Sequence, residues 1–271
     1  TSHGKLAIID DDGVTFTSHL DGSLHRFTPE RSIEIQHKLG ADIIYVFDEC
    51  TSPTADYAYQ REAMDRTHRW ARRSLAAHRQ SHVHDSTQGI YGIVQGGPDL
   101  RVESAKYLAD MDFDGYGIGG SFTKEDILGI LDVVNSELPE DKPRHLLGIG
   151  EPEDIFAGAA AGIDTFDCVV PTRKGRTGAV YTHQGSVIIR NAQYKDDFTP
   201  IDSECDCFVC KQFTRSYIHH LFRAGEMLGP ILATAHNIRF LTRLTGDIRT
   251  SILEGRLDSF KEDFLQTYRQ T

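Results

Sequence analysis

Three cysteines lie within six residues of one another, at Cys205, Cys207 and Cys210. Three thiolates and one imidazole form a closed tetrahedral zinc site, which leaves no open position for a catalytic water. The close spacing therefore predicts a structural zinc ion. With Cys50 and Cys168 the chain has five cysteines, an odd number that suits a metal site and a reducing cytoplasm better than a disulfide framework.

The fourth zinc ligand has three candidates. His219 and His220 fall inside the helix that is expected directly after the cysteines. His236 is expected at the start of the next helix, from where it could fold back on the cluster. We favour His236 for this reason.

Carboxylates end two of the apolar runs that we interpret as strands. Asp167 ends one run, within FDCVVPTR, and Asp48-Glu49 ends another. A single Asp at a strand end is more often a cap on the following turn. Acids that converge from two strands, however, are a common arrangement for glycosyl chemistry, so we hypothesise a catalytic role for Asp167. Glu49 could be purely structural.

Groups able to bind a polar ligand follow other strands. Gln95 provides an amide, Gly119-Gly120 exposes backbone N–H groups, and the carboxylate of Asp48 could accept hydrogen bonds from a guanine-like edge. Paired glycines more often mark a tight turn. Arg173-Lys174-Gly175-Arg176 is interpreted as a basic loop beside Asp167, either solvated or in contact with phosphate, and its position favours phosphate.

The elements that must position these residues alternate between strand and helix. Helical signals occur at 29–38, 55–79 and 123–134, the last opened by a capping box at Thr123. Strands are expected at 42–49, 89–97, 115–120, 145–150 and 162–170. Because polar residues end several different strands, we expect an α/β fold with a (β/α)8 barrel, and not a doubly wound sheet with a single switch point.

The pattern changes after Pro171. Residues 178–191 predict a hairpin that turns at His183-Gln184-Gly185, and the chain looks helical from Lys211 onward. We therefore expect residues 1–170 to form part of the barrel. Residues 171–271 are expected to form the basic loop, the hairpin, a zinc-binding helical subdomain and C-terminal helices packed on the barrel.

Bulk properties limit the function. The formal net charge of -11 argues against a general polyanion binder, so any RNA contact must be local. No apolar run approaches the roughly 20 residues needed to cross a bilayer. The first residues contain neither an initiator Met nor an apolar signal core, and we expect the chain to be a fragment.

Several motifs together resemble the bacterial tRNA-guanine transglycosylases. Those that carry the resemblance most specifically are GIVQGG (92–97), HLLGIGEPEDI (145–155), GIDTFDCVVPTRKGRTG (162–178), PIDSECDCFVC (200–210) and AHNI (235–238). The resemblance implies a cytoplasmic homodimer that acts on the anticodon stem-loop of tRNA. It would exchange guanine at the wobble position of GUN anticodons for a 7-deazaguanine, in queuosine biosynthesis.

The resemblance also implies a role for each matching residue. Asp167 matches the nucleophile, which forms a covalent glycosyl-enzyme. The base pocket matches Asp48, Gln95, Gly119, Gly120 and Leu147. The tRNA-contacting segments match Gly148, Ile149, Gly150, Glu151, Pro152, Glu153, Asp154, Thr172, Arg173, Lys174, Gly175 and Arg176. The zinc ligands match Cys205, Cys207, Cys210 and His236.

The chain departs from the family pattern in two places. The Asp-Ser-Gly-Gly stretch with the family's general acid/base would precede Thr1, so we expect this chain alone to be poorly active. Ser121-Phe122 follows Gly120, where bacterial members commonly have Leu-Ala. That difference leaves open whether 7-aminomethyl-7-deazaguanine or queuine is the incoming base.

Three other functions fit the sequence less well. A non-catalytic tRNA-binding partner subunit would be expected to lose the nucleophile, which is present here. An unrelated nucleoside hydrolase would leave the zinc cluster and the basic residues after Asp167 without a purpose. Archaeosine-forming relatives are a closer alternative, but they usually carry additional RNA-binding domains, which this chain is expected to lack.

Overall fold

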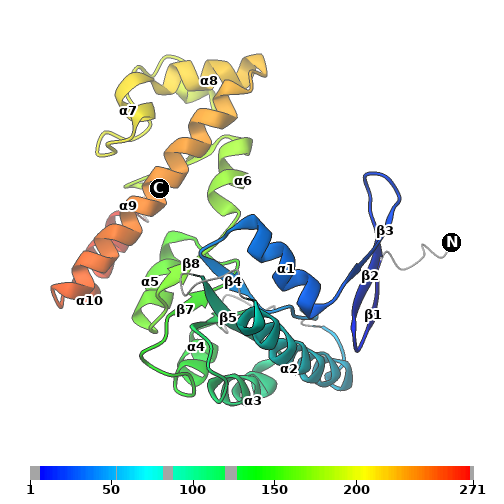
Figure 1. The fold of residues 1–271 in the computed structure, drawn as a ribbon. Helices are drawn as coiled ribbons and strands as arrows, with labels where there is room; N and C mark the ends of the chain where they lie inside the picture. Colours follow the sequence, from blue (N-terminus) through cyan, green and yellow to red (C-terminus); the bar gives the residue numbers. More distant parts are fainter. Residues whose placement is uncertain (1–6, 53, 82–87, 120–126, 269–271) are drawn as a thin grey trace. The chain divides into compact units, whose positions relative to one another are not determined.

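A computed structural model describes residues 7–52, 54–81, 88–119 and 127–268 (Figure 1). The chain divides into two compact units. The first unit comprises residues 1–147 and 161–165, and the second comprises residues 148–160 and 166–271. Among the described residues, no helix is both long and apolar enough to span a membrane.

A parallel sheet forms the centre of the first unit. Its strands are β4 (Ile43–Tyr45), β5 (Gly89–Val94), β6 (Gly115–Ile118), β7 (Arg144–Leu146) and β8 (Thr165–Phe166), and they are neighbours in that same order. A sheet in which each strand lies next to its predecessor winds in one direction, as in a (β/α) barrel, whereas a doubly wound sheet reverses. The prediction of barrel architecture is confirmed as a curled half-barrel. The strands are shorter than predicted, above all β8.

Helices connect the strands of this sheet along the chain. They are α1 (Pro29–Leu39), α2 (Tyr57–Gln80), α3 (Pro98–Ala109), α4 (Ile127–Asn135) and α5 (Pro152–Ala160). Thr28 caps α1 by accepting from the N–H of Arg31, and Gly40 ends the helix in the left-handed conformation, in agreement with the helix predicted at 29–38. The capping box expected at Thr123 lies outside the described residues.

An antiparallel sheet that the sequence analysis did not predict precedes α1. It consists of β1 (Ala7–Asp10), β2 (Gly13–Thr17) and β3 (Leu24–Phe27), paired in chain order. The indole N–H of Trp70 donates to the carbonyl oxygen of Asp11, at 2.7 Å. Because Trp70 is fully buried in α2, this bond ties the small sheet to the helical layer.

The second unit is built around one long helix, α9 (Leu228–Leu253), drawn in orange in Figure 1. Packed on it are α6 (Val170–Thr177), β9 (Ala179–Thr182), α7 (Phe208–Gln212), α8 (Arg215–Ala224) and α10 (Leu257–Tyr268). The hairpin of β9 and β10 (Gly185–Ile188) turns at His183-Gln184, as predicted.

Two details of the second unit contradict the sequence analysis. The basic residues 173–176 lie on α6 and not in a loop, because Pro171 suits the first turn of a helix and Gly178 ends it with φ of 86°. His236 lies in the interior of α9 and not at the start of a helix, because α9 continues unbroken from Leu228.

Candidate active site and metal centre

Four of the residues expected to form a base pocket follow the carboxyl ends of neighbouring parallel strands. Asp48 comes after β4, Gln95 after β5, Gly119 after β6 and Leu147 after β7. We call these four residues the strand-end cluster. All belong to the first unit, while Gly120, Ser121 and Phe122 lie outside the described residues.

Contacts within the strand-end cluster are direct. Nε2 of the buried Gln95 donates a hydrogen bond to Oδ2 of Asp48. A Cβ added at Gly119 would come within 3.0 Å of Leu147 Cδ1 and within 3.6 Å of Gln95 Nε2. The structure therefore brings together a carboxylate, an amide, a glycine without a side chain and an apolar side chain. Such groups can bind a flat ring that has polar atoms along its edge.

Burial controls the charge of Asp48. It raises the pKa of this carboxyl from 3.8 to about 6, against the hydrogen bond from Gln95, which lowers it. The negative charge of the adjacent Glu49 raises the pKa of Asp48 further, and it is the smallest of these contributions. Asp48 is consequently ionised at neutral pH but becomes protonated in mildly acidic solution.

Two residues of α3 that the sequence analysis did not identify hold the strand-end cluster in place. The buried Arg101 donates from Nη1 to the carbonyl oxygen of Gly119, at 2.6 Å. The hydroxyl of Ser104 accepts the backbone N–H of Gln95, at 3.2 Å. Their spacing of three residues places both on one face of the helix, but nothing in the sequence indicates which strand ends they reach.

Glu49 has the structural role that the sequence analysis left open. It is 6% exposed, and it accepts hydrogen bonds from Arg66 and Tyr59 of α2. Its backbone N–H donates to Thr67 Oγ1, at 3.0 Å. These bonds fix the loop that carries Asp48.

Asp167 belongs to the second unit, where it is exposed just beyond β8. Its Oδ1 accepts the backbone N–H of Gly148, at 3.0 Å. Gly148 has φ of 76°, a conformation that glycine adopts at little cost. The carboxylate also borders a cavity of about 210 Å³, which is lined mainly by apolar groups from Ile155, Pro171, Ile238 and Leu241. The backbone N–H of Gly148 therefore helps to orient the carboxylate of Asp167, and the residue is exposed.

Residues of the expected tRNA segments have internal contacts in this unit. Lys174 forms an ion pair with Glu151, with Nζ and Oε1 2.9 Å apart, and lies over the ring of Tyr181. The hydroxyl of Tyr181 also donates to Glu151, at 3.0 Å. Arg173 and Arg176 are exposed, so these two cations are better placed than Lys174 to meet an RNA phosphate.

Gly175 lies where α6 crosses α9. A Cβ at this position would come within 2.5 Å of Thr234 Oγ1 and 2.7 Å of the Thr234 backbone. The side chain of Asn237 joins the same elements by donating to the carbonyl oxygens of Pro171 and Ala179, each at 3.0 Å. The absence of a side chain at Gly175 thus permits the close approach of the helix that follows Asp167.

We predict that Gly175→Ala destabilises the protein by about 1–3 kcal/mol, because backbone atoms of α9 must move to admit the methyl group. Gly246→Ala is the matched control. Gly246 lies in α9, where no atom is within 4 Å of the added Cβ, and its substitution should be neutral or stabilising by up to about 1 kcal/mol. Urea denaturation of both variants measures the difference, and equal midpoints would contradict the tight crossing.

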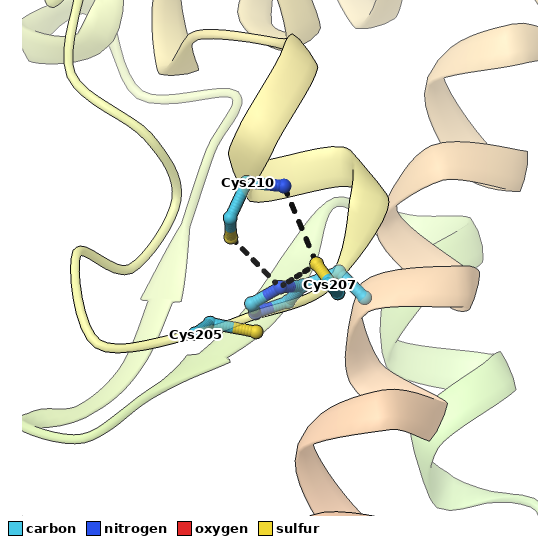
Figure 2. A group of neighbouring side chains, drawn as sticks. Cys205, Cys207 and Cys210 are labelled. Atoms are coloured by element: carbon cyan, nitrogen blue, oxygen red, sulfur yellow. Dashed lines mark hydrogen bonds between the residues drawn. The ribbon is translucent and has the colours of Figure 1, made fainter.

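The cysteines and His236 converge in the second unit, as Figure 2 shows for the three labelled sulfurs. The four ligand atoms lie within 4.8 Å of one another. Nδ1 of His236 is 3.5 Å from Cys207 Sγ and 3.3 Å from Cys210 Sγ. Tetrahedral zinc with ordinary bond lengths requires S···N separations of about 3.6 Å, so the cluster fits the ion.

A second contact fixes the tautomer of His236. Its Nε2 lies 2.7 Å from the carbonyl oxygen of Tyr181 and donates to it, which leaves the lone pair of Nδ1 for the metal. His219 instead has its Nδ1 3.0 Å from the carbonyl oxygen of Ile189. The choice of His236 over His219 and His220 is consistent with the cluster, and the zinc site is closed by four protein ligands.

The zinc site supports the segment that carries Asp167. His236 binds the carbonyl oxygen of Tyr181, while the neighbouring Asn237 accepts the N–H of Tyr181, at 3.0 Å, and donates to Pro171. Pro171 is four residues beyond Asp167. A zinc ion held by these four ligands would therefore stabilise the arrangement of α6, β9 and α9.

Comparisons with known proteins show which family this chain resembles over its whole length. The family model described as queuine tRNA-ribosyltransferase matches residues 1–270. A queuine tRNA-ribosyltransferase of Caldanaerobacter subterraneus subsp. tengcongensis is 49% identical over 98% of this chain and 72% of the relative. One from Herpetosiphon aurantiacus is 50% identical over 99% of this chain and 68% of the relative. One from Acetivibrio thermocellus is 49% identical over 98% of this chain and 72% of the relative.

Proposed function

This chain belongs to the queuine tRNA-ribosyltransferase family, and from that membership we propose that it exchanges guanine at the wobble position of GUN-anticodon tRNAs for a 7-deazaguanine. The observation that carries the proposal is the accessible carboxylate of Asp167, which is oriented by the N–H of Gly148. A protein that only bound tRNA would have no need of this group.

In the proposed reaction, Asp167 is the nucleophile. One of its oxygens forms a bond to C1′ of the ribose while the bond from C1′ to N9 breaks, and guanine leaves with that electron pair. The incoming base then forms the new bond from its N9 to C1′ as the ester to Asp167 breaks, and the proton lost from N9 balances the one that the departing guanine takes up. Two inversions at one carbon give net retention, as in retaining glycosidases.

The strand-end cluster is proposed to recognise the base. The ionised carboxylate of Asp48 would accept from the N–H and amino groups of the guanine-like edge, and the amide of Gln95 would contact its polar edge. Gly119 would admit the ring close to the backbone, and Leu147 would cover its face. Gly120 is included in this pocket on the family resemblance.

The tRNA-binding surface is proposed to include the segments 148–154 and 172–176. Arg173 and Arg176 would contact phosphates, and the backbone at Gly148 to Gly150 would contact the loop nucleotides. Glu151, Lys174 and Gly175 would act indirectly, because each has the internal contact described above.

The assay that tests this function measures incorporation of labelled guanine into tRNA by the natural protein. Incorporation into a GUN-anticodon tRNA, and none into the same tRNA with the wobble guanine replaced, would support the proposal. Tight tRNA binding without any incorporation would favour the non-catalytic partner subunit. A competition between 7-aminomethyl-7-deazaguanine and queuine would then identify the incoming base.

Binding of the base is predicted to weaken in acid. Below about pH 6, protonation of Asp48 removes an acceptor, so KM for the base should rise by about tenfold per pH unit. Because the pKa of Asp48 is raised in the folded chain, protonation of this carboxyl stabilises the folded state. Its contribution to the free energy of unfolding is fully present below pH 3.8 and is lost as the pH rises through about 6. Loss of base binding in acid would therefore not reflect unfolding at this site.

Initial rates from pH 5 to pH 8 at varied base concentration measure this effect. In Asp48→Asn the KM should be high throughout and independent of this ionisation. A KM that stays constant for the unaltered protein would contradict the role of Asp48.

A homodimer in the cytoplasm is the proposed form of the protein. Exposed apolar side chains occur on α8, at Tyr217, and at the start of α9, at Met227, Leu228 and Ile231. A second copy of the chain would cover them. Zinc-binding thiolates persist in a reducing compartment, which supports the cytoplasm. Light scattering that gives the monomer mass at micromolar concentration would refute the dimer.

A further inference from the structure

Tyr181 of β9 is fully buried, and both of its backbone groups are bonded to α9. Its N–H donates to Oδ1 of Asn237, at 3.0 Å, and its carbonyl oxygen accepts from Nε2 of His236, at 2.7 Å. Its ring stacks on that of Phe240, about one turn further along α9, with the ring centroids 5.4 Å apart. The long helix therefore fixes the position of Tyr181.

The hydroxyl of Tyr181 reaches the residue that precedes α5. It donates to Oε2 of Glu151, at 3.0 Å, while Nζ of Lys174 lies 2.9 Å from Oε1 of the same carboxylate and 4.6 Å from the centre of the Tyr181 ring. Burial and the negative charge of Glu151 raise the pKa of Tyr181, so its hydroxyl is the donor at neutral pH. We call these three residues the anchoring cluster.

The segment 148–151, which ends at Glu151, contains two glycines. Gly148 has φ of 76°, and no atom lies within 4 Å of a Cβ added there. Glycine loses more conformational freedom on ordering than any other residue, so this segment depends on contacts at its ends. At one end the N–H of Gly148 bonds Asp167, and at the other the carbonyl oxygen of Glu151 accepts the N–H of Ile155, at 3.0 Å. The anchoring cluster fixes that second end.

We propose that Tyr181 is a positioning residue for the nucleophile, because through Glu151 it holds the segment 148–151 so that the N–H of Gly148 meets Oδ1 of Asp167. This inference rests on the proposed function, in which Asp167 attacks C1′ of the ribose. Tyr181 acts through Glu151 and not on the reacting atoms. A displacement of about 1 Å in a reacting group can cost about a hundredfold in rate, so loss of this anchor should slow the attack.

The first test is Tyr181→Phe, which removes the hydroxyl and keeps the ring that stacks on Phe240. At saturating tRNA, the natural protein should form the covalent adduct about tenfold faster than this variant. A larger loss is not expected, because Lys174 still holds Glu151. The KM for the base should stay unchanged, since the strand-end cluster belongs to the first unit.

Tyr194→Phe is the matched control. Tyr194 is a buried tyrosine of the same unit, and its hydroxyl forms no hydrogen bond within the part of the chain that the structure describes. This variant should form the adduct at the natural rate. Both variants should melt within about 4 °C of the natural protein, because each loses a single hydroxyl.

A double-mutant cycle separates positioning through Glu151 from a general loss of packing. Glu151→Ala should slow adduct formation at least as much as Tyr181→Phe, and the double variant should be no slower than Glu151→Ala alone. Glu151→Gln should retain more of the rate than Glu151→Ala, because its amide oxygen can still accept the hydroxyl of Tyr181.

Equal rates of adduct formation in the natural protein and Tyr181→Phe would overturn the role of Tyr181. Rate losses that multiply in the double variant, or a KM for the base that rises as much as the rate falls, would overturn the path through Glu151. Absence of both exchange and adduct in the natural protein would instead overturn the proposed function, and with it the reaction on which this inference rests.

Discussion

Asp167→Asn is expected to reduce guanine exchange by roughly 10⁴-fold or more, because the amide cannot form the ester to ribose C1′. The amide oxygen can still accept the N–H of Gly148, which is the contact that orients this side chain. The fold and tRNA affinity should therefore be retained. Rates of labelled-guanine incorporation, together with tRNA binding and melting temperature, measure the three properties separately.

A matched variant guards against a general effect of lost charge. Asp263→Asn removes an exposed carboxylate of α10, in the same unit, and should leave exchange unchanged. If Asp167→Asn retained more than about a tenth of the natural rate, a carboxylate elsewhere would have to be the nucleophile. If it lost tRNA binding in the same proportion as exchange, Asp167 would be a binding residue.

Loss of the zinc ion is the second change with a large expected effect. Cys207→Ser should bind zinc poorly and lower the melting temperature by roughly 10 °C or more, since ligation energy stabilises the folded unit. Exchange should decline as well, because His236 and Asn237 hold the strand and helix next to Asp167. A zinc ion closed by four protein ligands would leave no position for the reacting groups.

Zinc content, melting temperature and exchange are measured on the same preparation. Cys50→Ser is the control, because Cys50 is an exposed thiol of the first unit and should leave zinc content unchanged. Cadmium or cobalt in place of zinc should restore both stability and exchange if the role is structural. Full activity in a metal-free protein would contradict the claim that the zinc site holds the elements next to Asp167 in place.

Much of the first unit follows from local patterns. Apolar runs that end in Asp48, Gln95 and Gly119 gave the strands and the edge at which these residues meet, because carboxyl ends of parallel strands share one side of a sheet. The run at 162–170 yielded only Thr165–Phe166, since α6 begins at Val170. The antiparallel sheet of β1, β2 and β3 was not predicted, because its strands are short and those at its two edges are mostly exposed.

The second unit shows where sequence reasoning stops. The three cysteines specify a metal by themselves, whereas the fourth ligand depends on how a long helix crosses the cluster. Lys174 looked available to RNA, but its partner Glu151 is 23 residues earlier in the chain. Contacts of this kind, like the bond from Arg101 to Gly119, depend on tertiary packing that no local spacing encodes.

The most direct test of the account is a search for the covalent intermediate. The natural protein is mixed with a GUN-anticodon tRNA and no incoming base, denatured, and separated on a gel that resolves protein from protein–RNA adduct. We predict an adduct at Asp167, with release of an equal amount of free guanine, and its decay when guanine is added back. Exchange of labelled guanine at an undiminished rate in Asp167→Asn, with the adduct absent from both proteins, would contradict the central claim that Asp167 is the nucleophile.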